Sequence, residues 1–330
     1  MQRKFNPVPA EGDNNVFTQS WFAVALSEEV QSGKILGRKF LDGKIILLRD
    51  EQGHVQAFSG YCVHLGTDLS NGEVVSGNVR CPLHHWVYDT QGQCVATGCG
   101  DKAPPTARLF QFPTTERYGI IWVFNGETPL WEIENFSKSY RDEELIVRAR
   151  KDKRTYPVDP WVIRSNTPDW QHLAFVHHMK MDVDIRDKFQ FEPYGLQVQI
   201  PVGLEEGSGQ QLEYNIRVSG TSLWTTAGRL SGKWHLQVSA LGIEVPGTST
   251  HFYSHAVHRG DGSDAAERRA RELIDELEFL FEKVLDEDMA VMTGMHYRPG
   301  LLTASDGVLA TYLDYVRRFP RAHPSREFIR

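Results

Sequence analysis

The feature that most constrains this chain is a pair of short motifs, each of which combines a cysteine with a histidine. Cys62 and His64 form the first motif, and Cys81 and His84 form the second after a spacer of sixteen residues. Together they offer two thiolates and two imidazoles, which are metal-binding groups. Both motifs stand in turn-rich segments. We therefore expect part of the chain to fold around a metal centre that is held between two loops.

The order of these ligands favours iron over zinc. Thiolates suit ferric iron bridged by sulfide, and two imidazoles can hold the second iron of such a cluster. A structural zinc site with the same ligands is the alternative, but zinc fingers usually place both cysteines before both histidines. Here the two residue types alternate, which favours a cluster of two irons and two sulfides. Cys94 and Cys99 lie outside the pattern and are interpreted as ordinary buried or free thiols.

A second group of potential ligands consists of Asn166, Asp169, His172 and His177. Two imidazoles plus a carboxylate leave open coordination positions on Fe(II), as in sites that activate O₂. His172 and His177 are five residues apart, or about 140° around an ideal helix, so they do not share a helix face. Their convergence on one ion requires a bulge or a helix end between them. The alternative is a pair of ordinary hydrogen-bonded histidines on a half-buried helix.

We expect the carboxylate ligand to be Asp288, which lies in the most clearly predicted helix of the chain. This helix begins at residue 263 or 264 and runs to about residue 292, and its apolar residues recur every three or four positions as one core-facing stripe. Asp288 lies on that stripe, whereas Asp286 and Glu287 are expected to point away. A buried carboxylate is costly unless it binds a cation. A buried salt bridge is the alternative role for Asp288.

Strand patterns dominate the first part of the chain. Residues 44–49 and 54–58 flank a turn at residues 50–53 and predict a β-hairpin. Residues 118–124 predict a further strand. Residues 1–126 are therefore expected to form a small antiparallel β domain.

Residues 127–330 are expected to form a second domain, which gives a fold of the α+β class. Residues 161–179 could hold a helix that starts near Pro168, since proline suits a first helical turn. Strand-like segments follow at residues 212–218, 222–226 and 233–240.

Length and charge set further limits. The chain has 330 residues and a formal net charge of −7, which fits two globular domains and argues against nucleic acid as the main partner. We find no apolar run of about 18 residues, so no membrane span is expected. With no apolar signal-peptide core near its start, the chain is predicted to be cytoplasmic.

The two ligand groups together resemble a known family. The first motif, flanked by Tyr61 and Trp86, resembles the Rieske motif, although Leu65 and His85 stand where many relatives have arginine and glycine. The second group and the Glu287–Asp288 pair resemble the catalytic domain of Rieske non-haem iron oxygenases. The length and motif context look most like the members built from one subunit type, such as vanillate demethylase-like and steroid hydroxylase-like enzymes.

This resemblance implies an N-terminal antiparallel β Rieske domain over residues 1–126. A catalytic domain with an antiparallel sheet flanked by helices would follow over residues 127–330. It also implies roles for the candidate site residues. The [2Fe–2S] cluster ligands would be Cys62, His64, Cys81 and His84, and the mononuclear non-haem Fe(II) ligands would be His172, His177 and Asp288.

In the family, the two centres of one subunit are too far apart for electron transfer, and the useful route crosses to a neighbour in a homotrimer. Asp169 matches the aspartate that links the iron-bound His172 to a cluster histidine of the neighbour, which corresponds to His84. Asn166 resembles a residue that lies near the iron, and both are counted as candidate catalytic residues.

The expected function is that of a terminal oxygenase. It would take electrons from a separate reductase or ferredoxin and use O₂ to hydroxylate or O- or N-demethylate a small aromatic or polycyclic substrate. Dihydroxylation or desaturation by the same site is one alternative. An electron-transfer protein without oxygenase activity is another, and a zinc-stabilised structural protein is a third.

Overall fold

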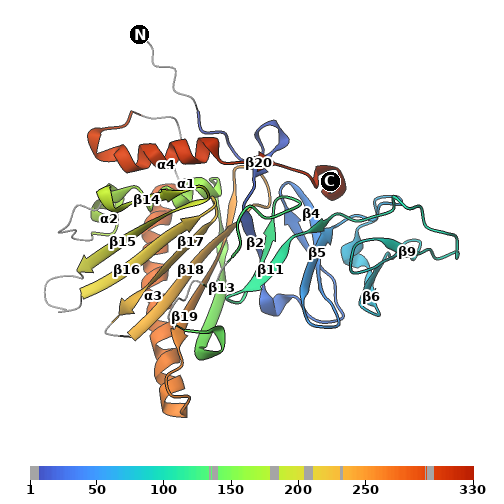
Figure 1. Cartoon of the computed structure of the whole chain (residues 1–330), viewed down its shortest axis with the longest axis horizontal. Helices are drawn as coiled ribbons and strands as arrows, with labels where there is room; N and C mark the ends of the chain where they lie inside the picture. Colours follow the sequence, from blue (N-terminus) through green and yellow to red (C-terminus); the bar gives the residue numbers. More distant parts are fainter. Residues whose placement is uncertain are drawn as a thin grey trace, which may run out of the picture. The chain divides into compact units, whose positions relative to one another are not determined.

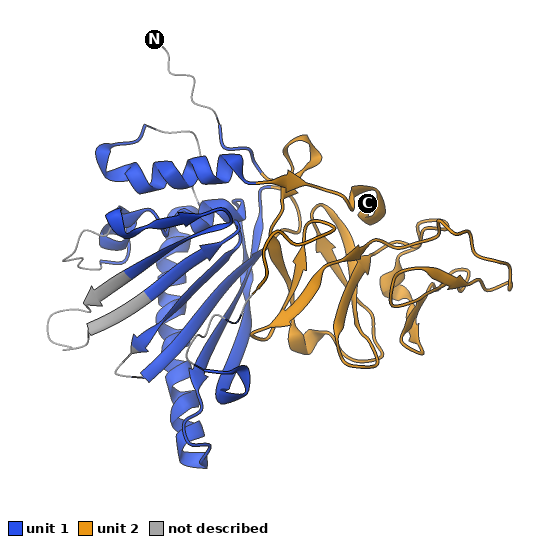
Figure 2. Ribbon diagram, viewed as in Figure 1, with its two compact units in different colours: residues 1–10, 134–241, 247–319 blue, residues 11–133, 242–246, 320–330 orange. Residues whose placement is uncertain are grey.

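The computed structural model describes residues 7–133, 135, 140–178, 186–203, 211–230, 233–293, 295 and 301–330. The chain forms two compact units (Figures 1 and 2). The N-terminal unit comprises residues 11–133, 242–246 and 320–330, and the sheet unit comprises residues 1–10, 134–241 and 247–319.

Three small antiparallel sheets make up most of the N-terminal unit. One has the order β10-β5-β4-β3, another β11-β12-β2, and the third β6-β7-β8-β9. The strands are β2 (Trp21–Leu26), β3 (Leu36–Phe40), β4 (Gly43–Arg49), β5 (Val55–Ser59), β6 (Glu73–Val75), β7 (Asn78–Arg80), β8 (Val87–Tyr88), β9 (Cys94–Ala96), β10 (Gln111–Phe112), β11 (Thr114–Arg117) and β12 (Ile120–Phe124). The predicted hairpin is confirmed, because β4 and β5 form an antiparallel pair in which Ile46 lies opposite Phe58.

Strand β4 joins two cores because it is buried on both faces. Ile45 and Leu47 pack into one apolar cluster, whereas Ile46 and Leu48 pack into another that also contains Cys62 and Cys81. Alternation along the strand explains this division, since successive side chains point to opposite faces. The second cluster therefore anchors the two loops that carry the cysteines.

The sheet unit is built on one antiparallel seven-stranded sheet with the order β13-β19-β18-β17-β16-β15-β14 (Figure 1). Its strands are β13 (Leu145–Tyr156), β14 (Gln190–Glu192), β15 (Gly195–Gly203), β16 (Gln211–Ser219), β17 (Leu223–Leu230), β18 (Lys233–Gly242) and β19 (Ser249–His258). Its helices are α1 (Pro160–Arg164), α2 (Trp170–Phe175), α3 (Asp264–Met292) and α4 (Gly307–Arg318). The predicted strands at residues 212–218, 222–226 and 233–240 fall within β16, β17 and β18. The α+β class is confirmed.

The long helix α3 confirms the sequence prediction at its start. The Ser263 side chain accepts a hydrogen bond from the amide of Ala266 and caps the helix. Leu273, Ile274 and Leu277 of α3 pack into a core that includes residues of β13 and β19. Leu280 and Val291 also belong to the apolar pattern of this helix but are exposed, so the buried stripe is narrower than the sequence predicts.

The helix expected near Pro168 is α2, which begins at Trp170 and occupies only a short part of residues 161–179. Two short helices occupy this segment, and Pro168 lies between them. The amide of Asp169 still donates to the carbonyl of Ser165, so the chain turns continuously from α1 into α2. Residues 179–185 lie outside the described residues.

The units also differ from the consecutive domains expected at residues 1–126 and 127–330. Strand β1 (Phe17–Thr18) pairs with β20 (Arg321–Ala322), which follows α4, and a last short helix α5 (Arg326–Ile329) ends the chain. Ile329 is fully buried in the same core as Ile45. The N-terminal unit is therefore completed by residues 320–330. No local pattern in residues 1–126 predicts that these distant residues pack against them.

Candidate metal centres

The two Cys-His motifs adopt the same loop conformation. Between β5 and β6, the Cys62 amide donates to the carbonyl of Thr67, and the Gly66 amide donates back to Cys62, both at 2.8 Å. Between β7 and β8, the Cys81 amide donates to the carbonyl of Trp86 at 2.8 Å, and the His85 amide donates back to Cys81 at 3.2 Å.

Each of these loops has one residue with a positive φ at the same position. Gly66 has φ of 73°, and His85 has φ of 53°. Glycine adopts this left-handed conformation freely, whereas a residue with a Cβ atom is strained there. The second loop therefore closes at the position where the sequence departs from the usual glycine.

The four side chains of the motifs divide by chemistry. Cys62 and Cys81 are buried, with 2% and 1% of their surface exposed, whereas His64 and His84 are exposed. The two imidazole rings lie 4.9 Å apart between centroids. Buried thiols beneath outward-facing imidazoles fit a cluster whose sulfur-ligated iron is inside and whose histidine-ligated iron faces outward.

Two aromatic residues fix these ligands. The His64 ring stacks on Trp86 with an interplanar angle of 5° and a centroid distance of 4.4 Å. The Tyr88 hydroxyl lies 3.0 Å from the Cys62 sulfur. Burial raises the pKa of Tyr88, so Tyr88 keeps its proton and can donate to a metal-bound thiolate. Burial also raises the pKa of the Cys62 thiol, so a thiolate at this position needs a cation beside it.

The remaining cysteines do not join this group. Cys94 is buried and its thiol lies 3.4 Å from the carbonyl of Ala96, while Cys99 is exposed. Neither forms a disulfide, which agrees with their interpretation as ordinary thiols.

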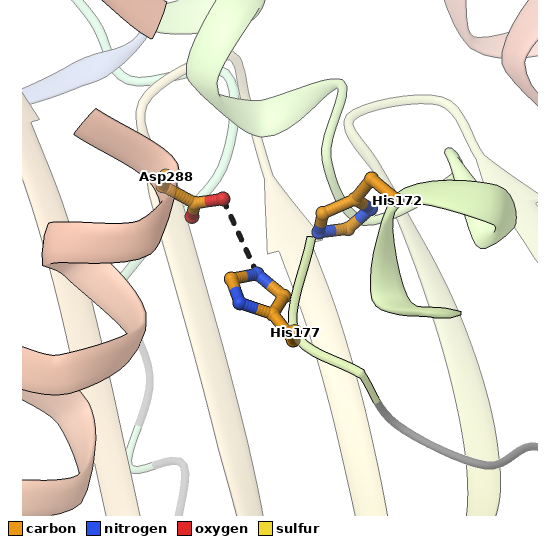
Figure 3. A group of neighbouring side chains, drawn as sticks. All are labelled: His172, His177 and Asp288. Carbon is orange, nitrogen blue, oxygen red and sulfur yellow. Dashed lines mark ion pairs between the residues drawn. The ribbon is translucent and has the colours of Figure 1, made fainter. Parts of the chain in front are cut away.

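The second constellation lies in the sheet unit and combines α2 with α3 (Figure 3). His172 is in α2, which ends at Phe175, and His177 follows the helix end. The amides of Val176 and His177 both donate to the carbonyl of His172. The predicted interruption is therefore a helix end, and it turns both imidazoles toward the same point. The ligand atoms of His172, His177 and Asp288 lie within 4.8 Å of one another.

The electrostatics at this point suit a cation. His177 Nε2 is 3.2 Å from Asp288 Oδ1, and only 2% of the His177 side chain is exposed. Burial works to lower the pKa of His177, but its hydrogen bonds to Asp288 and Glu287 outweigh this effect and raise the pKa. Burial lowers the pKa of His172. A metal ion would take the place of the proton on His177 Nε2, and the donor set of two imidazoles and one carboxylate matches Fe(II).

Glu287 differs from the prediction, because it does not point away from the site. Its Oε2 atom accepts a hydrogen bond from His177 Nδ1 at 2.8 Å. This bond leaves Nε2 directed at Asp288 and so fixes the orientation of the ring, which is the usual role of a carboxylate behind a metal-bound histidine. The side chain of Asp286 is 71% exposed, as expected, and pairs with Arg154.

The two candidate catalytic residues near His172 have local contacts. Asp169 immediately precedes α2, and its backbone carbonyl accepts a hydrogen bond from His172 Nδ1. This bond leaves His172 Nε2 free to face the other ligands. Asn166 is partly buried, and its backbone amide donates to the backbone carbonyl of Ile163. The predicted roles of the Asp169 carboxylate and the Asn166 side chain remain predictions.

Within the described part of the chain, no helix has both the length and the apolar character needed to cross a membrane.

Comparison with known proteins identifies the first constellation. Residues 20–113 match the family model of the Rieske [2Fe-2S] domain. This range contains both Cys-His motifs and favours the iron–sulfur interpretation over the zinc alternative.

Curated relatives share the sequence over about half of this chain. Dicamba O-demethylase, oxygenase component, from Stenotrophomonas maltophilia is 38% identical over 174 residues, which are 52% of this chain and 51% of the relative. The oxygenase component of 3-ketosteroid-9-alpha-monooxygenase from Rhodococcus rhodochrous is 31% identical over 49% of this chain and 43% of the relative. Cholesterol 7-desaturase from Bombyx mori is 29% identical over 52% of this chain and 38% of the relative. The matches thus span about half or less of these relatives.

Solved structures extend the likeness to nearly the whole fold. NdmA of Pseudomonas putida CBB5, solved with caffeine, superposes with a TM-score of 0.69 at 20% identity and covers 90% of this chain and 89% of that one. Dicamba monooxygenase bound to dicamba superposes with a TM-score of 0.65 at 22% identity and covers 91% and 97%. The chain thus contains a Rieske [2Fe-2S] domain, is similar in sequence to named oxygenase components over about half of its length, and shares the fold of NdmA and dicamba monooxygenase.

Proposed function

We propose that this protein is the terminal oxygenase of a multicomponent system and monooxygenates a small organic substrate. The observation that carries the proposal is the convergence of His172, His177 and Asp288 in the same chain as a Rieske domain. A Rieske electron carrier needs no second metal centre, so this convergence favours an oxygenase over such a carrier.

Each of the two proposed metal centres has its own set of ligands. Cys62, His64, Cys81 and His84 hold the [2Fe–2S] cluster, which accepts electrons one at a time from a separate reductase or ferredoxin. His172, His177 and Asp288 hold a mononuclear Fe(II), which supplies O₂ activation when it is bound. These three residues leave positions on the metal open. Glu287 holds the ring of His177 in the orientation that this ligation needs.

Assembly is part of the same proposal. Asp169 would link the two centres, because its backbone carbonyl accepts the hydrogen bond from His172 Nδ1 and, in a homotrimer, its carboxylate would orient His84 of a neighbouring copy. Measurement of the molar mass in solution tests this assembly. The predicted cytoplasmic location also belongs to the proposal and is tested by fractionation of the native cells.

Hydroxylation or demethylation is the favoured reaction, because relatives include an O-demethylase and a ketosteroid monooxygenase. Desaturation is the second candidate, because three of the relatives are named as cholesterol 7-desaturases. Product analysis with ¹⁸O₂ separates the two, since desaturation incorporates no oxygen into the product.

The first experiment is a determination of iron and acid-labile sulfide in anaerobically purified wild type and His172→Ala. We expect about three irons and two sulfides per chain in the wild type, and about one iron fewer in the variant with sulfide unchanged. Anaerobic reconstitution with Fe(II) before the assay replaces metal lost during purification. Two irons in both reconstituted proteins would refute the oxygenase proposal in favour of an electron carrier.

A further inference from the structure

The face of the large sheet that looks toward α3 carries polar side chains deep in the unit. Alternate side chains of a strand point to the same face of its sheet. Ser239 of β18 and His251 of β19 lie on the same face, because Ser239 Oγ is 2.7 Å from His251 Nε2. On β19, the rings of His251 and His255 lie 5.9 and 5.7 Å from the ring of Phe281 in α3. This face is therefore turned toward the helix that carries Asp288.

Several of these groups have polar atoms without a hydrogen-bond partner among the described residues. Thr226 of β17 lies directly opposite Gln237 of β18. Thr226 is 4% exposed and His255 is fully buried. Thr226 Oγ1, Gln237 Nε2 and both ring nitrogens of His255 are buried and form no hydrogen bond with any residue that the structure describes. Buried polar atoms nearly always have a partner in native proteins, so a set of orphans on one face needs an explanation.

The same face leads to the candidate iron site. Thr226 lies opposite Ile216 of β16, and Ile216 packs in a cluster with Trp170 and Leu277. Trp170 is two residues before His172 in α2. Trp224, which shares its face of β17 with Thr226, packs in a cluster with Met289, the neighbour of Asp288. Apolar residues thus connect the orphan polar atoms with both helices of the site.

The chemistry of these groups describes what they can bind. Gln237 Nε2 is a donor, the Thr226 hydroxyl can donate, and a neutral imidazole offers one donor and one acceptor. Burial, with repulsion by His235 and Arg148, lowers the pKa of His255 to about 3. Burial lowers the pKa of His235 to about 4. Both rings are neutral at pH 7. Arg148 of β13 lies opposite His255 on this face, but its guanidinium is paired with Asp275 and Glu278. Thr226, Gln237 and His255 therefore offer hydrogen-bond donors that carry no positive charge of their own.

We propose that Thr226, Gln237 and His255 form a specificity site for an uncharged hydrogen-bond-accepting oxygen, such as a carbonyl, on an otherwise apolar substrate. The inference rests on the proposed oxygenase function and narrows its substrate class. By strand alternation, Trp234 and Phe252 lie on the opposite face of the sheet from these three residues.

The test uses matched probes on the iron-loaded full chain. Acetophenone is compared with ethylbenzene, and 2-acetylnaphthalene with 2-ethylnaphthalene, with dissociation constants from titration calorimetry. We expect the ketone of at least one pair to bind about tenfold more tightly than its hydrocarbon partner, the value of one good hydrogen bond. Thr226→Val and His255→Phe should each reduce this ratio severalfold. Thr225→Val is the matched control, because Thr225 is buried on the opposite face of the same strand, and it should keep the wild-type ratio.

A second measurement needs no ligand. If the hydroxyl of Thr226 has no partner in the free protein, Thr226→Val should unfold at a temperature no lower than the wild type, because an apolar isostere removes an unpaired polar group. A clear fall in the unfolding temperature of Thr226→Val relative to Thr225→Val would show a structural partner such as an ordered water, and would overturn the proposal. Equal affinity for ketone and hydrocarbon in both pairs would also overturn it. Tighter binding of benzoate and 2-naphthoate than of the ketones would overturn the assignment to uncharged substrates.

Iron analysis of the same preparations separates failure of this inference from failure of the proposed function. A protein with about three irons per chain and no discrimination between the probes refutes the specificity site alone. A protein that does not hold the second iron after reconstitution refutes the oxygenase function, whatever it binds.

Discussion

The hydrogen bond between Glu287 and His177 leads to a prediction that the sequence motifs alone do not give. In Glu287→Gln the side chain keeps its shape but loses its negative charge. His177 Nδ1 donates to Glu287 Oε2 at 2.8 Å, the His177 side chain is 2% exposed and that of Glu287 is 28% exposed. The bond is therefore shielded from water, and a change in the charge of its acceptor should alter the metal affinity of the other ring nitrogen, Nε2.

The size of the effect follows from the position of Glu287 behind a candidate ligand. Loss of a carboxylate that orients a metal-bound histidine typically weakens metal binding by about 10- to 100-fold, which corresponds to about 1.4–2.7 kcal/mol. A neutral amide can accept the same hydrogen bond, so we expect Glu287→Gln near the lower end and Glu287→Ala near the upper end of this range.

The assay is an anaerobic competition between the protein and a chelator for Fe(II) at one fixed pH. Asp286→Asn is the matched control, because it removes a negative charge from the residue next to Glu287. The side chain of Asp286 is 71% exposed and pairs with Arg154. We expect the control to bind iron within about twofold of the wild type, since exposed charges act weakly on a buried site. Thermal unfolding of the metal-free proteins verifies that the variants are folded. Equal Fe(II) affinity for Glu287→Gln, Asp286→Asn and the wild type would refute the reasoning.

Three further predictions concern the cluster loops and the buried histidines. Tyr88→Phe should lower the reduction potential of the cluster by roughly 20–65 mV, the equivalent of about 0.5–1.5 kcal/mol for one hydrogen bond to the more negative reduced state; a redox titration followed by visible absorption measures this, and an unchanged potential would show that the 3.0 Å contact to Cys62 carries no bond. His85→Gly should raise the thermal unfolding midpoint of the N-terminal unit, because it relieves a left-handed residue at φ of 53°, and a lower midpoint would mean that the His85 side chain has a stabilising contact. Burial lowers the pKa of His235 to about 4 and those of His251 and His255 to about 3. The unfolded chain, with an ordinary histidine pKa of about 6.5, binds these protons first as the pH falls, so stability is full above about pH 6.5 and decreases below it by up to about 1.4 kcal/mol per pH unit for each histidine. Urea unfolding at pH 7.5, 6 and 5 measures the decrease, and constant stability over this range would contradict the burial of neutral histidines.

The elements with strong local signals were predictable from sequence. The β4–β5 hairpin has two apolar runs around a turn that contains Gly53, and α3 has a capping serine followed by a regular apolar spacing. In both cases the pattern that defines the element lies within the element itself. The helix end between His172 and His177 was also predictable, because the angular spacing of an ideal helix excludes a shared face.

The details that depend on distant contacts were not predictable. An ideal helix turns Glu287 about 100° away from Asp288, which assigned it to the solvent side. Its longer side chain nevertheless reaches His177, whose position beyond the end of α2 is set by tertiary structure. Likewise, the orphan atoms of Thr226 and His255 follow from the packing of three strands against α3, and alternation alone marks them only as one side of a sheet.

The pairing of β1 with β20 has a consequence for how the protein is made. About 190 residues separate the last residue of the first segment of the N-terminal unit, Ile133, from its closing segment at residues 320–330. A ribosome needs roughly 10–40 s to synthesise that length at about 5–20 residues per second. During this interval the core that receives Ile329 is open, while the whole sheet unit emerges and can fold. Any step that occurs on the nascent chain, such as insertion of a cluster, would therefore meet an N-terminal unit whose core stays open until residues 320–330 have emerged.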